Sequence, residues 1–201
     1  MKKIPTYKVT IGDLDSNLGM TTISLVDEPA VMKNFVCFSE DEEKQIMTKF
    51  TKDEEKHNIT GVAMLADTQI YRYNDEIGGY YIVFPKDVIE EMAIKYSKNG
   101  YWNEVNLQHN ENDYTDGAIM YEMYIKNSER GIVPTEFSDI PDGSLMVSFH
   151  ITDDELWDNI KNSGTLNGFS IEVSASMEKF IKQEPQNEID DFEEFVNEYV
   201  D

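Results

Sequence analysis

The amino-acid sequence predicts an α+β fold that is rich in short, mostly antiparallel strands and contains few helices. Apolar runs rich in β-branched and aromatic residues recur along the chain, and clusters of Gly, Asn and Asp separate them. Such runs are typical of strands joined by tight turns. Apolar residues at helical spacing occupy only two segments between residues 59 and 182, so helices are expected to be the minority.

The first 38 residues are expected to form the N-terminal strands of the main domain. Runs with strand character cover residues 7–11 and 22–26, turn residues separate them, and a third apolar run covers 35–38. Residues 39–58 are strongly charged. A solvated helix would fit this segment, but we favour a partly ordered charged linker.

Residues 59–182 are expected to form the core of the domain. A helix is predicted over 86–98, because Pro85 stands at its start and Asn99-Gly100 supplies a C-terminal stop. The strands at 60–66 and 80–84 are expected to flank a turn at 74–79 as paired or barrel strands. Further strands are predicted at 103–109, 118–125 and 145–151.

A second helix and a final strand follow in this core. Thr152 and Glu155 have the spacing of a capping box, in which the hydroxyl and the carboxylate satisfy each other's backbone donors. The helix is expected to end near Ser163-Gly164 and leads into an alternating run at 169–176, whose apolar and polar side chains face opposite sides. Ser170 therefore stands near the start of a strand, on its polar face.

The C-terminal tail, 183–201, has a composition of its own. It contains eight acidic residues and no basic one. Its apolar residues recur at helical spacing, at positions 189, 192, 195, 196 and 199. This pattern predicts an acidic amphipathic helix, which we expect to dock on its own domain or on a partner.

The net charge of −23, from 40 acidic against 17 basic residues, limits the partners of this chain. A surface of this charge should repel nucleic acid and anionic membranes, so neither is an expected partner. The single Cys37 excludes an internal disulfide and fits a reducing compartment. The sequence shows neither a membrane-spanning apolar run nor the apolar core of a signal peptide, so a cytosolic site of synthesis is expected.

The common catalytic and cofactor motifs are absent from the sequence. The three histidines and one cysteine have no zinc-site spacing, and neither a P-loop nor G-x-G-x-x-G occurs. No metal or cofactor is therefore expected. The sequence around Ser170 is G-F-S-I-E, which does not fit the G-x-S-x-G elbow of α/β-hydrolases.

Ser170 can be a polar residue on a strand surface or a nucleophile, and the residues alone leave both interpretations open. A serine nucleophile needs an imidazole within hydrogen-bond reach and donors for the oxyanion. His109 is the best candidate, because it ends a predicted strand beside a polar turn. His57 lies in the charged linker, and His150 immediately precedes a helix cap, where a structural role is expected.

Several blocks of sequence, in this order, resemble the tailed-phage prohead (capsid maturation) serine proteases. The more specific blocks are Asp27-Glu28-Pro29-Ala30 and Gly168-Phe169-Ser170-Ile171-Glu172. The resemblance extends over about residues 20–178 and is closest to the branch of phage serine proteases of defective-prophage type. The other matching blocks lie at 59–64, 106–110 and 154–157.

The resemblance implies a herpesvirus-assemblin-like fold, which is a mostly antiparallel β-barrel surrounded by helices. The family's serine nucleophile matches Ser170, and its histidine, the general base, matches His109. The implied activity is limited proteolysis of scaffold and major capsid precursors, often with self-cleavage, inside the immature capsid in the host cytoplasm. A homodimer is one possible oligomeric state of the chain.

Two features depart from the family pattern. The third catalytic member usually follows the serine on the next strand in this fold class, whereas here the chain after Lys182 predicts an acidic helix. Glu172, on the face of Ser170, and Glu122, in the strand after His109, are the remaining candidates. No arginine follows Ser170, so backbone N–H groups would have to stabilise the oxyanion.

Two rival functions stay open at this point. One is a catalytically inactive capsid or scaffold protein on the same fold. The other is an inhibitor that mimics nucleic acid through its charge, but the acidic residues cluster at 39–58 and in the tail and do not pattern a single face.

Overall fold

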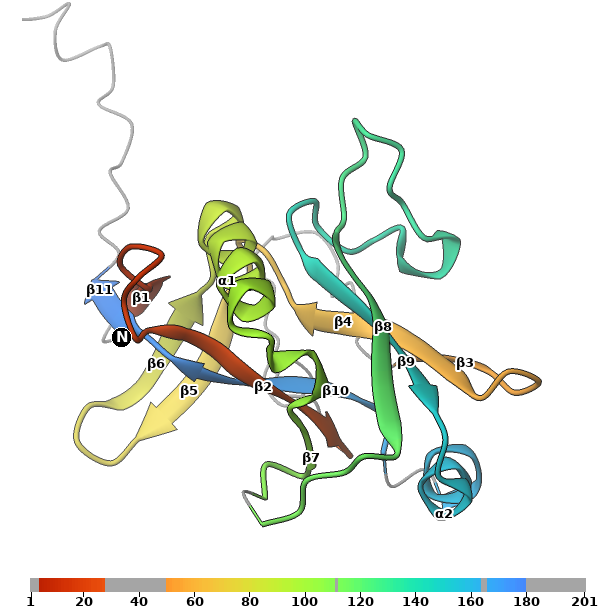
Figure 1. Ribbon diagram of the computed structural model, residues 1–201. Helices are drawn as coiled ribbons and strands as arrows, with labels where there is room; N and C mark the ends of the chain where they lie inside the picture. The colour runs from red at the N-terminus through yellow and green to blue at the C-terminus, as the bar shows by residue number, and fades with distance from the viewer. Residues whose placement is uncertain (1–3, 28–49, 111, 164–165, 180–201) are drawn as a thin grey trace, which may run out of the picture.

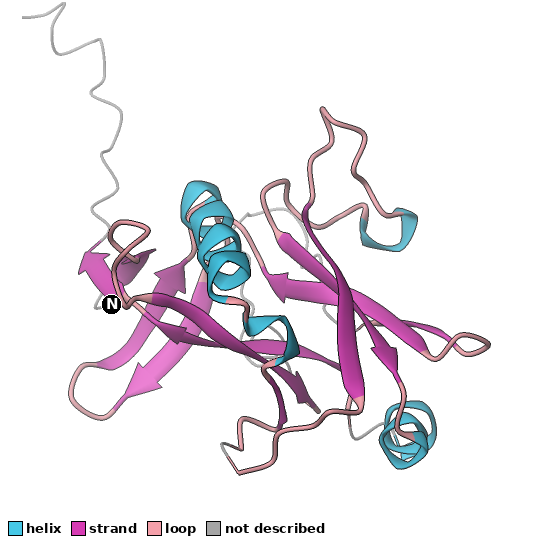
Figure 2. Cartoon of the chain, in the orientation of Figure 1, coloured by secondary structure: helices cyan, strands magenta, loops and turns pink. Residues whose placement is uncertain are grey.

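The computed structural model describes residues 4–27, 50–110, 112–163 and 166–179. Its described part is mostly strand with few helices, which confirms the α+β class (Figures 1 and 2). The strands are β1 (Thr6–Thr10), β2 (Gly19–Val26), β3 (Thr51–Asp53), β4 (Asn58–Met64), β5 (Ile70–Asn74), β6 (Gly78–Val83), β7 (Val105–Leu107), β8 (Ala118–Ile125), β9 (Leu145–Ile151), β10 (Gly168–Ser174) and β11 (Ser176–Lys179). The helices are α1 (Lys86–Asn99) and α2 (Asp154–Asp158), with short helical turns at η1 (Tyr101–Asn103), η2 (Thr135–Phe137) and η3 (Asn159–Ser163).

The strands divide into three sheets. The β1 sheet has the order β11-β1-β6-β5, the β2 sheet β10-β2-β7, and the β4 sheet β3-β4-β9-β8. Most neighbours are antiparallel, but β1 runs parallel to β6 and β2 runs parallel to β7. Figure 1 shows β10 (blue) alongside β2 (red), and β11 continuing from β10 into the β1 sheet.

The predicted closed barrel is not seen in the described residues, where the strands form three separate open sheets. One physical reason lies between β10 and β11. The β10–β2 register shifts between Glu172 and Val173, and regular pairing stops at Ala175 before β11 begins. A bulge of this kind bends a strand and increases its twist, and here the chain leaves one sheet for another.

The predicted helix over 86–98 is confirmed by α1, which ends at Gly100 in the left-handed region with φ of 75°. The second helix is shorter than its spacing suggested, and its N-cap is Asp153, not Thr152. The Asp153 carboxylate accepts a hydrogen bond of 2.7 Å from the Leu156 backbone N–H. After Asp158 the chain continues as a π-helical turn.

The hairpin around residues 74–79 differs from the expectation. Its two strands are β5 and β6, which pair from Ile70 with Ile82 to Asn74 with Gly78. The strand at 58–64 instead pairs with β9. The residues of β5 mix aromatic and polar side chains and do not show a clear strand pattern in the sequence. The prediction that the strand at 60–66 precedes this turn is therefore wrong.

The predicted charged linker and the predicted C-terminal tail lie partly or wholly outside the described residues. Of the charged linker predicted at 39–58, the described residues 50–58 include β3 and the first residue of β4. Residues 39–49, Cys37 and the predicted tail helix at 183–201 lie outside the described residues. No helix in the described part of the chain is long and apolar enough to cross a bilayer.

One main core joins the three sheets and α1. Its largest fully buried side chains include Tyr96 of α1, Phe149 of β9 and Phe169 of β10. Phe169 lies 5.3 Å, between ring centroids, from both Phe149 and Phe50. The residue next to Ser170 is thus packed at the centre of the molecule, which fixes the position of that part of β10.

Gly61 of β4 allows this aromatic cluster to form. A Cβ atom at this position would lie 2.9 Å from the Phe50 Cβ and 3.1 Å from the Phe169 Cε2. Contacts this short require the backbone or the rings to shift. The missing side chain at Gly61 therefore makes room on β4 for the two rings.

We predict that Gly61→Ala destabilises the protein by about 1–3 kcal/mol, the usual cost of overpacking a core. Urea unfolding followed by circular dichroism would measure the change in the free energy of unfolding. An unchanged unfolding midpoint would mean that β4 and the two phenylalanines separate at no cost, and would contradict the packing described here.

Candidate active site

The β2 sheet has one apolar face and one polar face. On the apolar face, Ile23, Leu25, Val105 and Phe169 are at most 2% exposed and belong to the core. The register pairs Ser170 with Ser24 and Ser24 with Asn106, so these three side chains lie side by side on the opposite face. We call this surface the polar face, and it consists of Thr22, Ser24, Asn106, Ser170 and Glu172.

The polar face is buried to an unusual degree for a row of polar side chains. Ser24 and Asn106 are 0% exposed, and Ser170 is 6% exposed. Polar groups buried in this way need hydrogen-bond partners, because each unpaired one costs free energy. Ser24 is paired with His109 from the loop that follows β7, and Asn106 is paired with Glu172.

His109 reaches the polar face through a tight turn after β7. The backbone N–H of Gln108 donates to the Leu25 carbonyl, and the next residues fold back through a bond from the Leu107 N–H to the Asp113 carbonyl. Gln108 and His109 have φ of 55° and 58°, in the left-handed region that non-glycine residues rarely adopt. The strand predicted at 103–109 therefore ends at Leu107, and His109 belongs to the turn.

His109 contacts a hydroxyl and a carboxylate of the polar face with one ring nitrogen. Its Nδ1 forms a hydrogen bond of 3.0 Å with the Ser24 Oγ. The Glu172 Oε1 lies 3.7 Å from the same Nδ1. The histidine side chain is 43% exposed and the glutamate side chain 27% exposed, so the pair stands at the open margin of a buried polar row.

Asn106 holds the Glu172 carboxylate in this position. Its Nδ2 donates a hydrogen bond of 2.5 Å to the same Oε1 that lies near His109. Because β2 separates β7 from β10, this bond spans the central strand of the sheet. The Asn106 Oδ1 is buried and has no hydrogen-bond partner among the described residues.

Ser170 lies on the same face, on β10, directly opposite Ser24 of β2, which is the serine that His109 contacts. Cα atoms of directly opposed residues in antiparallel strands are about 4.5–5.5 Å apart, and Ser170 is opposed to Ser24. In the described part of the chain no side-chain hydrogen bond joins Ser170 to His109. The structure thus brings His109 and Glu172 together and places Ser170 beside them without a direct bond.

The other candidates from the sequence lie in different surroundings. The Ser148 Oγ donates to the Glu122 Oε2 at 2.7 Å, within the β4 sheet. His150 Nδ1 is 2.9 Å from the Asn58 Oδ1, opposite it in the same sheet. The His57 ring stacks on Trp157, with 4.6 Å between ring centroids. Of the two candidate carboxylates, only Glu172 contacts His109 among the described residues.

Ser24 and Asn106 were not identified as site residues from the sequence. Both lie within predicted strands, and both are polar positions in an alternating pattern. That alternation shows only that a side chain shares a face with its own second neighbours. It gives no indication that the strands at 22–26 and 103–109 lie next to the strand of Ser170.

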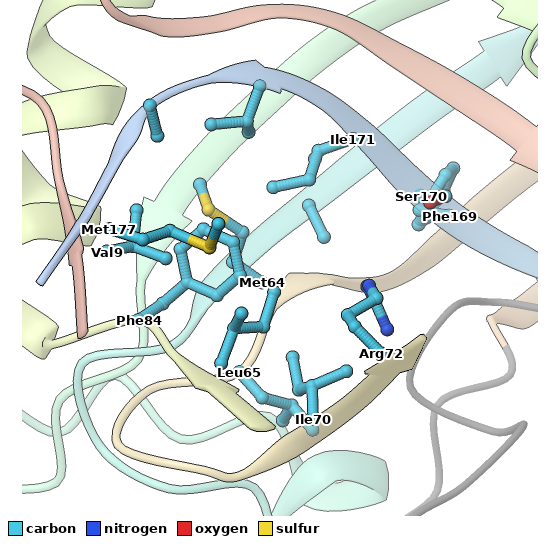
Figure 3. A pocket seen from close by; sticks show the side chains of 14 residues that line it. Val9, Met64, Leu65, Ile70, Arg72, Phe84, Phe169, Ser170, Ile171 and Met177 are labelled. Carbon is cyan, nitrogen blue, oxygen red and sulfur yellow. The ribbon is translucent and has the colours of Figure 1, made fainter. Parts of the chain in front are cut away.

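An apolar cavity of about 310 Å³ lies along β10 (Figure 3). Figure 3 shows Arg72 and Ser170 at one side of the cavity and Val9 and Met177 at the other. Burial lowers the pKa of the Arg72 guanidinium below its ordinary value. The remaining lining residues are Ala63, Met64, Leu65, Ile70, Ile82, Phe84, Phe169, Ile171, Val173 and Ala175.

The chemistry available at the polar face is proton transfer and nucleophilic attack by a hydroxyl. An imidazole beside a carboxylate can accept a proton from a serine hydroxyl and return it to a leaving group. No cluster of three or more metal-ligating side chains occurs in the described ranges. The contacts of His109 with a hydroxyl and a carboxylate, beside Ser170, are those of a candidate serine hydrolase site.

Comparison with known families agrees with this chemistry. The family model described as "Putative phage serine protease XkdF" matches residues 43–181, which is more than half of the chain. This range includes His109, Ser170 and Glu172 and excludes Ser24. No curated protein and no solved structure matches the chain. On the strength of the family match, the chain belongs to this family of phage serine proteases.

Proposed function

We propose that this protein is a serine endopeptidase of phage capsid maturation, which cleaves scaffold and major capsid precursors inside the immature capsid. The observation that carries the proposal is the polar face. On it, a serine in the family-matched segment lies beside a histidine that contacts both a buried hydroxyl and a carboxylate. Membership of a phage serine protease family supports the same reaction class.

In this proposal Ser170 is the nucleophile and His109 the general base. Ser170 attacks the scissile carbonyl carbon, His109 takes the hydroxyl proton, and the same proton passes to the leaving amine. Glu172 is the third member, because it lies next to His109 whereas Glu122 is bonded to Ser148. Backbone N–H groups near Ser170 stabilise the oxyanion.

The proposal requires His109 to approach Ser170 when a substrate binds. Catalytic hydrogen bonds in free enzymes are often long and tighten only in the complex with substrate. His109 stands on a turn, and its side chain is partly exposed. The proposal therefore requires a movement of this turn that brings the His109 Nε2 toward Ser170 and keeps the contacts of Nδ1.

The apolar cavity supports a peptide substrate. Ser170 lines this cavity together with apolar side chains of β10, β5 and β6. A volume of about 310 Å³ is at the small end of ligand pockets and suits an amino-acid side chain. We propose that it binds a large apolar side chain of the precursor, close to the bond that is cut.

The first test is co-expression with the scaffold and major capsid proteins that we propose as substrates. We predict that Ser170→Ala and His109→Ala each lower precursor cleavage by about a thousandfold or more, the scale of losing a nucleophile or its base. Gels and mass spectrometry of the assembled particles would measure the processed fraction.

Matched controls are available in the β4 sheet. Ser148→Ala and His150→Ala change the same residue types on β9 and should leave cleavage at the wild-type level. Precursor cleavage that continues in Ser170→Ala or in His109→Ala would show that the catalytic assignment is wrong.

A catalytically inactive capsid or scaffold protein is the second candidate function. Two observations favour it: Ser170 is only 6% exposed, and it has no hydrogen bond to His109 in the described part of the chain. Under this alternative, wild-type chain assembles with the capsid proteins but leaves every precursor uncut. The same co-expression therefore distinguishes the two functions.

The cavity gives a separate prediction. Ala175→Phe would fill the space beside β10, and we expect precursor cleavage to fall by about tenfold or more, the scale of a lost apolar contact. Ser174→Phe adds the same ring at an exposed neighbour that does not line the cavity, and it should cleave normally. Equal cleavage by both variants would mean that the cavity binds no part of the substrate.

A further inference from the structure

We propose that Ser24 is a positioning residue, whose hydroxyl fixes the ring orientation and the tautomer of His109. The inference rests on the proposed function, in which His109 is the general base. Ser24 lies outside the part of the chain that matches the family. The evidence for its role is therefore the set of contacts on the polar face, and not the family match.

Ser24 is a rigid point of attachment. It is fully buried on β2, the central strand of its sheet, and β10 and β7 pair with it on its two sides. The His109 ring, by contrast, is 43% exposed and stands on a turn. The hydrogen bond of 3.0 Å between the Ser24 Oγ and the His109 Nδ1 therefore ties the exposed His109 ring to a buried residue of the central strand.

The contacts at Nδ1 also select one tautomer. The Glu172 Oε1 lies 3.7 Å from Nδ1, and a carboxylate at this distance favours a proton on that nitrogen. The Nδ1–H then donates to the Ser24 Oγ. Because the hydrogen bond at one ring nitrogen sets the state of the other, Nε2 keeps its lone pair and can accept a proton from Ser170.

The same geometry argues against Ser24 as the nucleophile. In a serine–histidine–acid arrangement the hydroxyl and the carboxylate bind opposite ring nitrogens, whereas here both approach Nδ1. Ser24 is also 0% exposed, whereas Ser170 lines the cavity. A substrate carbonyl therefore has a route to Ser170, while Ser24 is covered.

The test compares Ser24→Ala with Ser24→Thr, which keeps a hydroxyl. One readout is the rate at which a fluorophosphonate probe labels Ser170, measured across a range of pH. The second is the ¹⁵N NMR spectrum of the His109 ring, assigned by its loss in His109→Gln. Ser148→Ala is the matched control, because it also removes a buried, hydrogen-bonded hydroxyl from a strand.

We expect Ser24→Ala to slow the labelling of Ser170 by about 10- to 100-fold, the usual effect of removing a group that orients an active-site ligand. The His109 spectrum should change from the Nδ1–H form to a mixture of tautomers, and the pH profile of labelling should shift. Ser24→Thr should recover most of the labelling rate and the Nδ1–H spectrum. Ser148→Ala should change neither readout, even if it lowers stability.

Two results would overturn the inference. One is an unchanged labelling rate and His109 spectrum in Ser24→Ala. The other is probe attached to Ser24 in the wild type, which would make it the nucleophile. If the probe labels no serine, the proposed function fails, and the NMR comparison alone decides the role of Ser24: a tautomer that depends on its hydroxyl supports the inference, and one that does not refutes it.

Discussion

The position of β2 between β10 and β7 is the constraint on which the candidate site depends. Side chains alternate along a strand, so a slip of one residue would turn every side chain of β2 to the opposite face. Ile23 and Leu25 are fully buried in the core, and exposing them would cost several kcal/mol. Their burial fixes the register, and the register places Ser24 between Ser170 and Asn106.

This arrangement creates a buried row of polar side chains, which is unfavourable unless each is paired. Ser24 is paired with His109, and Asn106 with Glu172. The pairing is incomplete, because the Asn106 Oδ1 has no partner in the described ranges. The turn that brings His109 into place also holds two non-glycine residues at positive φ, at a cost on the order of 1–3 kcal/mol each. Local costs of this kind are concentrated at functional sites.

Local signals in the sequence identified α1 and most of the strands, whereas the family resemblance supplied the Ser170–His109 pair of candidates. Pro85 and Gly100 mark the ends of α1 clearly, because each depends only on backbone conformation within a few residues. The sheet order depends on contacts between distant segments, so neither the open sheets nor the place of Ser24 could be predicted. Glu122 and Glu172 both stand on strands in the sequence, and only the pairing of those strands separates them.

Two features of β10 bear on the proposed proteolysis. Ser170 and Glu172 lie on the polar face, while Ile171 and Val173 line the cavity. Ser170 also lines the cavity, so β10 brings the candidate nucleophile next to an apolar surface. β10 is also an edge strand of the β2 sheet, and edge strands are where extended peptides can add to a sheet. In the proposed function, a peptide added along that edge would place a side chain in the cavity and its scissile carbonyl near Ser170, which is the relation that cleavage requires.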